Sequence, residues 1–241
     1  MASTFFISDL HLDPARPAIT RALHDFLRQH RHSDALYILG DLFEAWIGDD
    51  DDSAIATEVA ALLREFSATG TPLFFIQGNR DFLLGQDFCH SVGAQLLPEL
   101  SVIDLYGEPT LLMHGDTLCT ADVDYQKFRK TARSADFQVD FLARSLAERR
   151  VIAAQMRKMS KESSSNKAQD IMDVTTSEVD NVMRAQGVQR LIHGHTHRPA
   201  RHDAIGHGTR WVLGDWAEHG WYIQASANNI ELVKFIINNE L

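Results

Sequence analysis

Short apolar runs alternate with amphipathic stretches through the first third of the chain. The apolar runs at residues 4–7, 35–39 and 73–76 each end abruptly in polar residues, as buried strands do. Between them, residues 17–31 and 53–68 carry apolar side chains at helical spacing. The order strand–helix–strand–helix–strand predicts a parallel sheet with right-handed crossovers.

The second half of the chain is richer in predicted strands. Residues 94–105 and 110–113 are predicted to be strands joined by a turn at 107–109. Further strands are predicted at 190–193, 209–213, 221–224 and 230–235. An α/β first half followed by a β-rich second half predicts two packed sheets flanked by helices.

Residues 122–187 interrupt the strands with a long stretch of helical character. Its apolar positions fit helices, and neither a repeat nor a linker marks an independently folding unit. We therefore expect one domain over residues 1–241, in which 122–187 form a helical insertion that acts as a lid.

Composition restricts the class of protein. A chain of 241 residues with 44% hydrophobic and 23% charged residues can bury a full core. The two cysteines, Cys89 and Cys119, do not suggest a disulfide framework, so a reducing cytoplasm is expected. No apolar run approaches the roughly 18–20 residues that span a bilayer, although a peripheral membrane contact stays open.

Charge is spread unevenly. The net charge of −10 argues against general nucleic-acid binding. Residues 121–170 nevertheless carry 11 Lys and Arg against 7 Asp and Glu, which makes this segment net +4. The four consecutive aspartates at 49–52 are expected to form a solvated loop.

Polar residues that could bind metal follow the ends of the predicted strands. A single Asp at a strand end commonly caps a turn and a single His is commonly packed, but here several motifs share this placement. Seven oxygen and nitrogen donors are too many for one ion and suit two, and a donor set without thiolate favours Mn²⁺ or a similar first-row ion. The residues are Asp9, His11, Asp41, Asn79, His114, His195 and His197.

These motifs, in their order and spacing, resemble those of calcineurin-like metallophosphoesterases. The resemblance implies a four-layer αββα sandwich, an α/β fold. It implies one metal bound by Asp9, His11, Asp41 and His197, and a second bound by Asp41, Asn79, His114 and His195, with Asp41 bridging. The motifs are Asp9-x-His11, Gly40-Asp41-x-x-Glu44, Gly78-Asn79-Arg80-Asp81, His114-Gly115-Asp116 and Gly194-His195-x-His197.

Arg80 departs from the family pattern. Many members have a histidine after the asparagine, where it can protonate an alkoxide leaving group. A guanidinium cannot release its proton at neutral pH, but it can bind phosphate and stabilise charge in a transition state. Such a site suits a leaving group that needs no proton, so we expect cleavage of a pyrophosphate in preference to a monoester.

Two longer motifs resemble the UDP-2,3-diacylglucosamine pyrophosphatases of lipid A biosynthesis, and the resemblance spans essentially the whole chain. These motifs are Gly-Asp-Leu-Phe-Glu-Ala-Trp-Ile-Gly-Asp-Asp at 40–50 and Gly-Asn-Arg-Asp-Phe at 78–82. The resemblance implies a hydrolase with two Mn²⁺ in which water attacks the α-phosphorus, yielding UMP and 2,3-diacylglucosamine 1-phosphate. It implies catalytic roles for Asn79, Arg80 and His195.

The same resemblance gives the insertion a purpose. A diacylated substrate needs an apolar chamber, and a basic face would suit a peripheral protein on the cytoplasmic side of the inner membrane. We expect Arg149, Arg150, Arg157, Lys158 and Lys161 to form that face. Substrate contacts are implied for Asn79, Arg80, Asp122, Tyr125, Arg157, Ser160, Ser164, Lys167 and His195, with Asn166 as an alternative to Ser164, because many relatives carry Asn at that position.

Two other functions stay open at this point. Another dinuclear phosphoesterase could act on a soluble dinucleoside polyphosphate or cyclic nucleotide, but it would have no need of a basic, apolar-lined insertion. A non-catalytic scaffold on the same fold would typically have lost metal ligands, whereas all seven are present here. No nucleic-acid or protein partner is expected.

Overall fold

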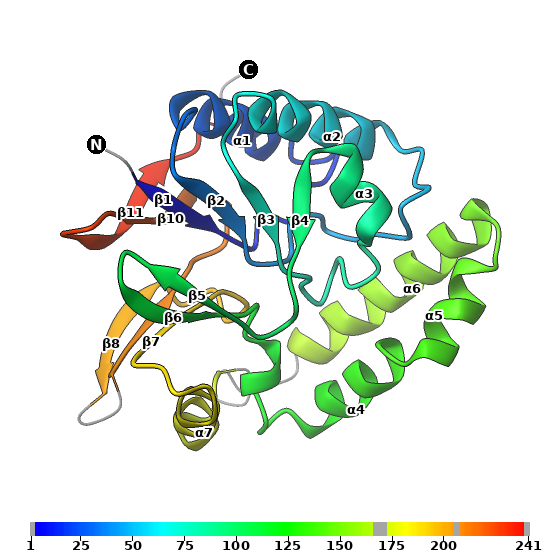
Figure 1. Cartoon of the computed structure of the whole chain (residues 1–241). Coiled ribbons are helices and arrows are strands. Elements are labelled where there is room, and N and C mark those ends of the chain that lie inside the picture. Colours follow the sequence, from blue (N-terminus) through cyan, green and yellow to red (C-terminus); the bar gives the residue numbers. More distant parts are fainter. Residues whose placement is uncertain (1–2, 166–172, 205–207, 239–241) are drawn as a thin grey trace.

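Two sheets pack face to face in the computed structural model, which describes residues 3–165, 173–204 and 208–238 (Figure 1). The first sheet has the strand order β11-β10-β1-β2-β3-β4 and the second β5-β6-β7-β9-β8. The strands of the first sheet are β1 (Thr4–Ile7), β2 (Ala35–Ile38), β3 (Leu73–Phe75), β4 (Ala94–Leu96), β10 (His219–Ala225) and β11 (Ile230–Ile236). Those of the second are β5 (Ser101–Leu105), β6 (Glu108–Leu112), β7 (Arg190–His193), β8 (Ala200–Ala204) and β9 (Gly208–Val212).

Pairing within the sheets explains why the polar motifs meet at one edge. Strands β1 to β4 pair in parallel, as do β6, β7 and β9, whereas β10 and β11 join the first sheet in antiparallel fashion. Side chains from both sheets, among them Phe6, Leu112 and Trp211, form a shared buried cluster. The carboxyl ends of the parallel strands of both sheets therefore open toward the same region.

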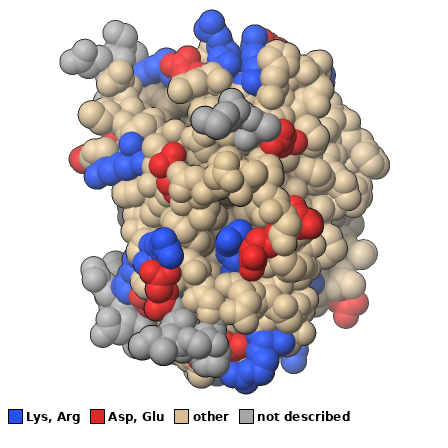
Figure 2. Space-filling model, turned by 60° about the vertical axis from the view of Figure 1, so that its left-hand side comes forward, with Lys and Arg blue, Asp and Glu red and all other residues tan. Residues whose placement is uncertain are grey.

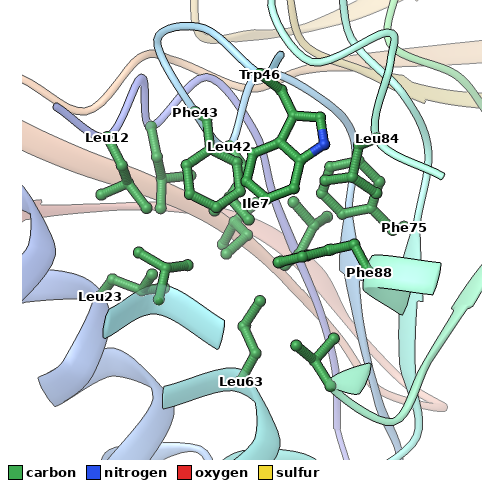
Figure 3. Packing of buried hydrophobic residues seen from close by; sticks show 14 of the residues in the cluster. Ile7, Leu12, Leu23, Leu42, Phe43, Trp46, Leu63, Phe75, Leu84 and Phe88 are labelled. Atoms are coloured by element: carbon green, nitrogen blue, oxygen red, sulfur yellow. The ribbon is translucent and has the colours of Figure 1, made fainter. Parts of the chain in front are cut away.

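Helices cover the outer face of each sheet. Helices α1 (Pro17–Gln29), α2 (Ala54–Ser67) and α3 (Gln86–Ser91) lie on the first sheet, and α7 (Thr176–Gln186) lies on the second (Figure 1). Figure 3 shows the packing beneath α2 and α3, where Trp46 and Phe43 lie beside Phe88, with 4.8 Å between the rings of Trp46 and Phe88. The expected four-layer αββα sandwich is confirmed.

Three further helices form a separate group beside the sandwich (Figure 1). They are α4 (Val123–Ala132), α5 (Ala135–Leu142) and α6 (Leu146–Ser165), and we call this group the lid. Helix α7 lies in the same predicted insertion but does not join them, because Val179 and Met183 pack against the second sheet. No helix in the described ranges is both long and apolar enough to cross a bilayer.

The strand predicted at 94–105 is two strands. Strand β4 pairs with β3 in the first sheet, and β5 pairs with β6 in the second, so residues 97–100 carry the chain between the sheets. Pro98, which has no N–H to donate, lies in this connection. Helix α3 and strand β8 were not predicted; they span only six and five residues.

The acidic run at 49–52 is only partly the expected solvated loop: Asp50 and Asp52 are exposed, but the side chains of the run make specific contacts. Asp49 accepts hydrogen bonds from the backbone N–H groups of Gly85 and Phe88, at 2.8 and 3.0 Å, and so holds the start of α3. Asp50 forms a two-pronged ion pair with Arg149 of α6, in which Arg149 Nη1 lies 2.7 Å from Asp50 Oδ1. Through these contacts, the loop that follows β2 binds the start of α3 and helix α6.

The expected basic outer face of the insertion is wrong for Arg149 and Arg157, whereas Arg150 is exposed as expected, although its charge is paired. Arg149 is only 3% exposed because it is paired with Asp50, and Arg150 pairs with Asp51 and Asp52. Arg157 points inward, where it pairs with Glu44. Lys158 is exposed, and the side chain of Lys161 lies outside the described residues.

Candidate metal centre

The seven candidate metal ligands lie together where the strands of both sheets end. Asp9 and His11 follow β1, and Asp41 follows β2. Asn79 follows β3, His114 follows β6, and the pair His195 and His197 follows β7. Side chains separated by up to 188 residues are thus brought into one region, in which Asp9, His11, Asp41 and His114 are buried and His197 is 38% exposed.

The backbone is strained at five of these seven positions. Their φ angles are 58° at Asp9, 49° at His11, 53° at Asp41, 68° at His195 and 55° at His197, which places them in the left-handed region. Residues other than glycine rarely adopt this conformation, and such strain costs about 1–3 kcal/mol per residue. Strain concentrated at one edge of the sheets indicates a functional site.

Two glycines allow the ligand loops to approach one another. A Cβ atom on Gly78 would lie 2.2 Å from Asp41 Oδ1, and one on Gly194 would lie 2.2 Å from Asp9 Oδ2. No side chain fits at either position without displacing a candidate ligand. The glycines of the Gly78-Asn79 and Gly194-His195 motifs are therefore required by close packing.

The first group of donors is built around Asp9. Oδ1 of Asp9 lies 3.4 Å from Nε2 of His197, which in turn lies 3.2 Å from Nε2 of His11. Oδ2 of Asp41 approaches His11 Nε2 to 3.9 Å. Asp9 Oδ2 accepts hydrogen bonds from Ser8 Oγ and the backbone N–H of His195, whereas Oδ1 is buried and accepts none from the described residues.

The second group is built around Asn79. Its Oδ1 lies 2.9 Å from His114 Nε2 and 2.8 Å from His195 Nδ1, and the two ring nitrogens are 3.2 Å apart. Oδ1 of Asp41 lies 3.7 Å from His114 Nε2. The two oxygens of Asp41 thus face different groups, as a bridging carboxylate would.

This donor set fits divalent cations. An unpartnered buried carboxylate oxygen and pairs of imidazole nitrogens that face each other at 3.2 Å are poorly satisfied by one another. His114 Nδ1 lies 2.8 Å from the carbonyl oxygen of Leu39, which fixes the ring so that Nε2 points into the site. The residues expected from the sequence as ligands are those the structure brings together, and their metal assignment stays a prediction.

Two buried aspartates, Asp81 and Asp116, stabilise the loops around the candidate ligands through hydrogen bonds. Asp81 is fully buried and accepts hydrogen bonds from the backbone N–H groups of Asp41, Leu42 and Gly78. Burial, with the charge of Asp41 second, raises the pKa of Asp81 to about 6. Its carboxylate joins the loops that carry Asp41 and Asn79.

Asp116 attaches helix α4 of the lid to the loop that follows β6. It is buried, and its Oδ2 accepts hydrogen bonds of 2.7 Å from both Tyr125 Oη and Arg129 Nε of α4. Burial alone would raise the pKa of Asp116, but the charges of His114, Arg133 and other bases lower it below its ordinary value. Both aspartates stand within the motifs of the sequence, but no role was predicted for either.

The two histidines of the Gly194-His195-x-His197 motif differ in protonation. Burial lowers the pKa of His195 to about 4, and the nearby His114 adds to this effect. Burial also lowers the pKa of His197, but the carboxylate of Asp9, whose Oδ1 lies 3.4 Å from Nε2, outweighs it and raises that pKa to about 9.

The expected substrate residues surround a cavity that begins beside the second donor group. Its volume is about 350 Å³, and it is lined by Asn79, Arg80, Asp122, Tyr125, Arg157 and Ser160. The remaining wall is largely apolar, with Trp46, Phe82, Phe128, Phe137, Phe141 and Met156. His195 lies behind Tyr125, with 5.8 Å between the two rings. The side chain of Ser164, together with Asn166 and Lys167, lies outside the described residues.

Metal binding should depend on pH through His197. A coordinating imidazole must be neutral, and with a pKa of about 9 His197 holds a proton at pH 7. Affinity for the cation should therefore rise about tenfold per pH unit from pH 6.5 to 8.5. Calorimetric Mn²⁺ titrations in two buffers of different ionisation enthalpy should show release of this proton. A His197→Asn variant should lose the proton release, and a flat profile in the wild-type chain would contradict the assignment.

Comparisons with known proteins show the family to which the chain belongs. Residues 3–199 match the calcineurin-like phosphoesterase family. The chain is 53% identical to a UDP-2,3-diacylglucosamine hydrolase of Cellvibrio japonicus, over 95% of this chain and 98% of the relative. It is 52% identical to a protein of the same name from Marinobacter nauticus, over 94% of each chain. A dimetal phosphatase of Danio rerio shares the fold at 13% identity, with a TM-score of 0.50 over 98% of this chain and 99% of that one. The chain belongs to the calcineurin-like phosphoesterase family.

Proposed function

We propose that the chain hydrolyses the pyrophosphate bond of UDP-2,3-diacylglucosamine, a step of lipid A biosynthesis, to give UMP and 2,3-diacylglucosamine 1-phosphate. Two relatives that match nearly the full length carry the name of this hydrolase. The observation that carries the proposal is the apolar cavity that adjoins Asn79 and Arg80 at the edge of the donor cluster. It suits a substrate in which a diphosphate lies next to acyl chains.

The seven candidate ligands would hold two Mn²⁺ ions. The donors are imidazole, carboxylate and amide, without the thiolates typical of structural zinc sites. Bound there, the ions would lower the pKa of a water molecule and polarise the phosphoryl oxygens. Asp9, His11 and His197 would hold one ion, Asn79, His114 and His195 the other, and Asp41 both.

Arg80 would bind the diphosphate. Its backbone N–H donates to Asp41 Oδ1 at 2.8 Å, and its Nη1 lies 3.4 Å from Ser160 Oγ of α6. Its Nε is buried and has no partner among the described residues, so a donor is free for a phosphate oxygen. In this role, the positive charge of Arg80 stabilises the negative charge on the phosphate oxygens, and Arg80 donates no proton to the products.

The chemistry needs no general acid. Water adds to the α-phosphorus, the bond to the bridging oxygen breaks, and 2,3-diacylglucosamine 1-phosphate leaves with that oxygen. A phosphate group of this kind is stable as an anion at neutral pH. Asn79 and His195, at the boundary between donor cluster and cavity, complete the proposed catalytic set with Arg80.

We propose that membrane contact uses apolar side chains of the lid. The basic residues expected to form that face are largely paired, whereas Val139, Met159 and Val123 are exposed by 70%, 68% and 56%. Figure 2 shows another side of the molecule. On this side, acidic and basic side chains are scattered in small groups. A lid that rests on the cytoplasmic side of the inner membrane would receive the lipid substrate directly.

Isotope labelling tests the reaction. The chain with Mn²⁺ in ¹⁸O-water should convert UDP-2,3-diacylglucosamine to products with the label in UMP, and an Arg80→Ala variant should lose about 10²–10³ in kcat. Label in the sugar phosphate would place the attack at the β-phosphorus. Faster cleavage of a dinucleoside polyphosphate or a cyclic nucleotide would favour a soluble substrate and contradict the proposal.

Two adjacent alanines of α6 test the chamber. Ala153 lines the cavity, whereas Ala154 is exposed. Ala153→Trp should fill the chamber and lower kcat/KM for the diacylated substrate about tenfold or more, because the displaced acyl carbons lose their burial. Ala154→Trp should leave kcat/KM close to wild type. Equal effects of the two variants on kcat/KM would show that the cavity does not hold the acyl chains.

A further inference from the structure

Glu44 lies between the candidate metal centre and the lid. It follows β2 in the Gly40-Asp41-x-x-Glu44 motif, and it is neither one of the seven candidate ligands nor one of the expected substrate contacts. Its two carboxylate oxygens face different partners, His11 on one side and Arg157 on the other. Its side chain is about one quarter exposed.

Toward the centre, Glu44 faces the outer nitrogen of a candidate ligand. Oε2 lies 3.3 Å from His11 Nδ1, while the opposite ring nitrogen, Nε2, faces His197 and Asp41. His11 Nδ1 is buried and forms no hydrogen bond in the described part of the chain, so the approach of Glu44 Oε2 is a close polar contact that a small movement would turn into a hydrogen bond. A carboxylate in this place fixes the tautomer and the orientation of a metal-binding histidine.

Toward the lid, Glu44 holds Arg157 of α6. Glu44 Oε1 pairs with Arg157 Nη2, whereas Nε and Nη1 of the same guanidinium are buried and have no partner in the described ranges. Arg157 also lines the cavity. Since the guanidinium is rigid, fixing one nitrogen fixes the direction of the other donors.

We propose that Glu44 is a positioning residue that couples occupancy of the metal site containing His11 to the position of the Arg157 half of α6. A cation that orders His11 also orders Glu44, which then holds Arg157 over the cavity with its remaining donors available to an anionic group. Linkage makes the effect reciprocal, so an ordered α6 favours metal binding. The inference rests on the proposed two-metal centre.

The attachment of α6 at its other half provides an internal control. Arg149 is bound to Asp50 and to the carbonyl oxygen of Ile47, eight residues before Arg157 and so about 12 Å along the helix. This attachment does not involve a candidate ligand. Loss of the Glu44 contacts should therefore loosen residues 153–160 and leave residues 146–151 unchanged.

Two measurements without substrate test the coupling. In the wild-type chain, added Mn²⁺ should slow amide hydrogen exchange of residues 153–160 by about fivefold or more. Glu44→Gln should abolish this slowing and weaken one of the two metal-binding steps by about 10–100-fold, leaving the other unchanged. Asp52→Asn, which removes an exposed pair between the same loop and Arg150, should leave both readouts at wild-type values.

Glu44→Asp gives a second variant that keeps the charge but is too short to reach both partners. It should also lose the slowing of exchange by Mn²⁺, and it serves if Glu44→Gln fails to fold. Either wild-type metal affinity at both steps in Glu44→Gln, or slowing of exchange that persists in both variants, would overturn the coupling. A chain that binds no metal would overturn it together with the proposed centre.

The two proposals fail in different ways. Coupling without cleavage of UDP-2,3-diacylglucosamine would mean that only the substrate is wrong. Cleavage without coupling would mean that only the role of Glu44 is wrong.

Discussion

Two carboxylates with almost no exposed surface, those of Asp9 and Asp41, lie among four imidazole rings at the ends of four strands. Buried charges are costly unless they are paired or coordinate metals, and no described residue donates a hydrogen bond to Asp9 Oδ1. Positive charge supplied by cations would offset this cost. Left-handed backbone conformations at five ligand positions, and the absence of a side chain at Gly78 and Gly194, allow the carboxylate and imidazole groups to come this close.

The lid depends on the same loops. Helix α4 is held by Asp116, which follows His114, and α6 is held by Asp50 and Glu44 in the loop that carries Asp41. Asp116 and Glu44 are two and three residues from a candidate ligand, and Asp50 is nine residues from one. The cavity between the lid and the sandwich is a consequence of this arrangement, and it places apolar walls beside charged groups.

Much of the sandwich was predictable from the sequence because its strands are short, apolar and closed by polar motifs. The seven candidate ligands were predictable for the same reason, since strand ends of a parallel sheet share an edge. The role of the 49–52 run could not be predicted. Its partners Arg149 and Arg150 lie about 100 residues away in the sequence, and no local sequence pattern indicates such ion pairs. The switch of sheets at 97–100 was missed because an apolar strand has the same pattern in either sheet. Ser164, Asn166 and Lys167 stay predictions.

Anomalous diffraction from crystals grown with Mn²⁺ tests the central claim most directly. The two-metal account predicts two manganese peaks, one within bonding distance of Asp9, His11, Asp41 and His197, the other within bonding distance of Asp41, Asn79, His114 and His195. A single peak, or two peaks that do not share Asp41, would contradict it.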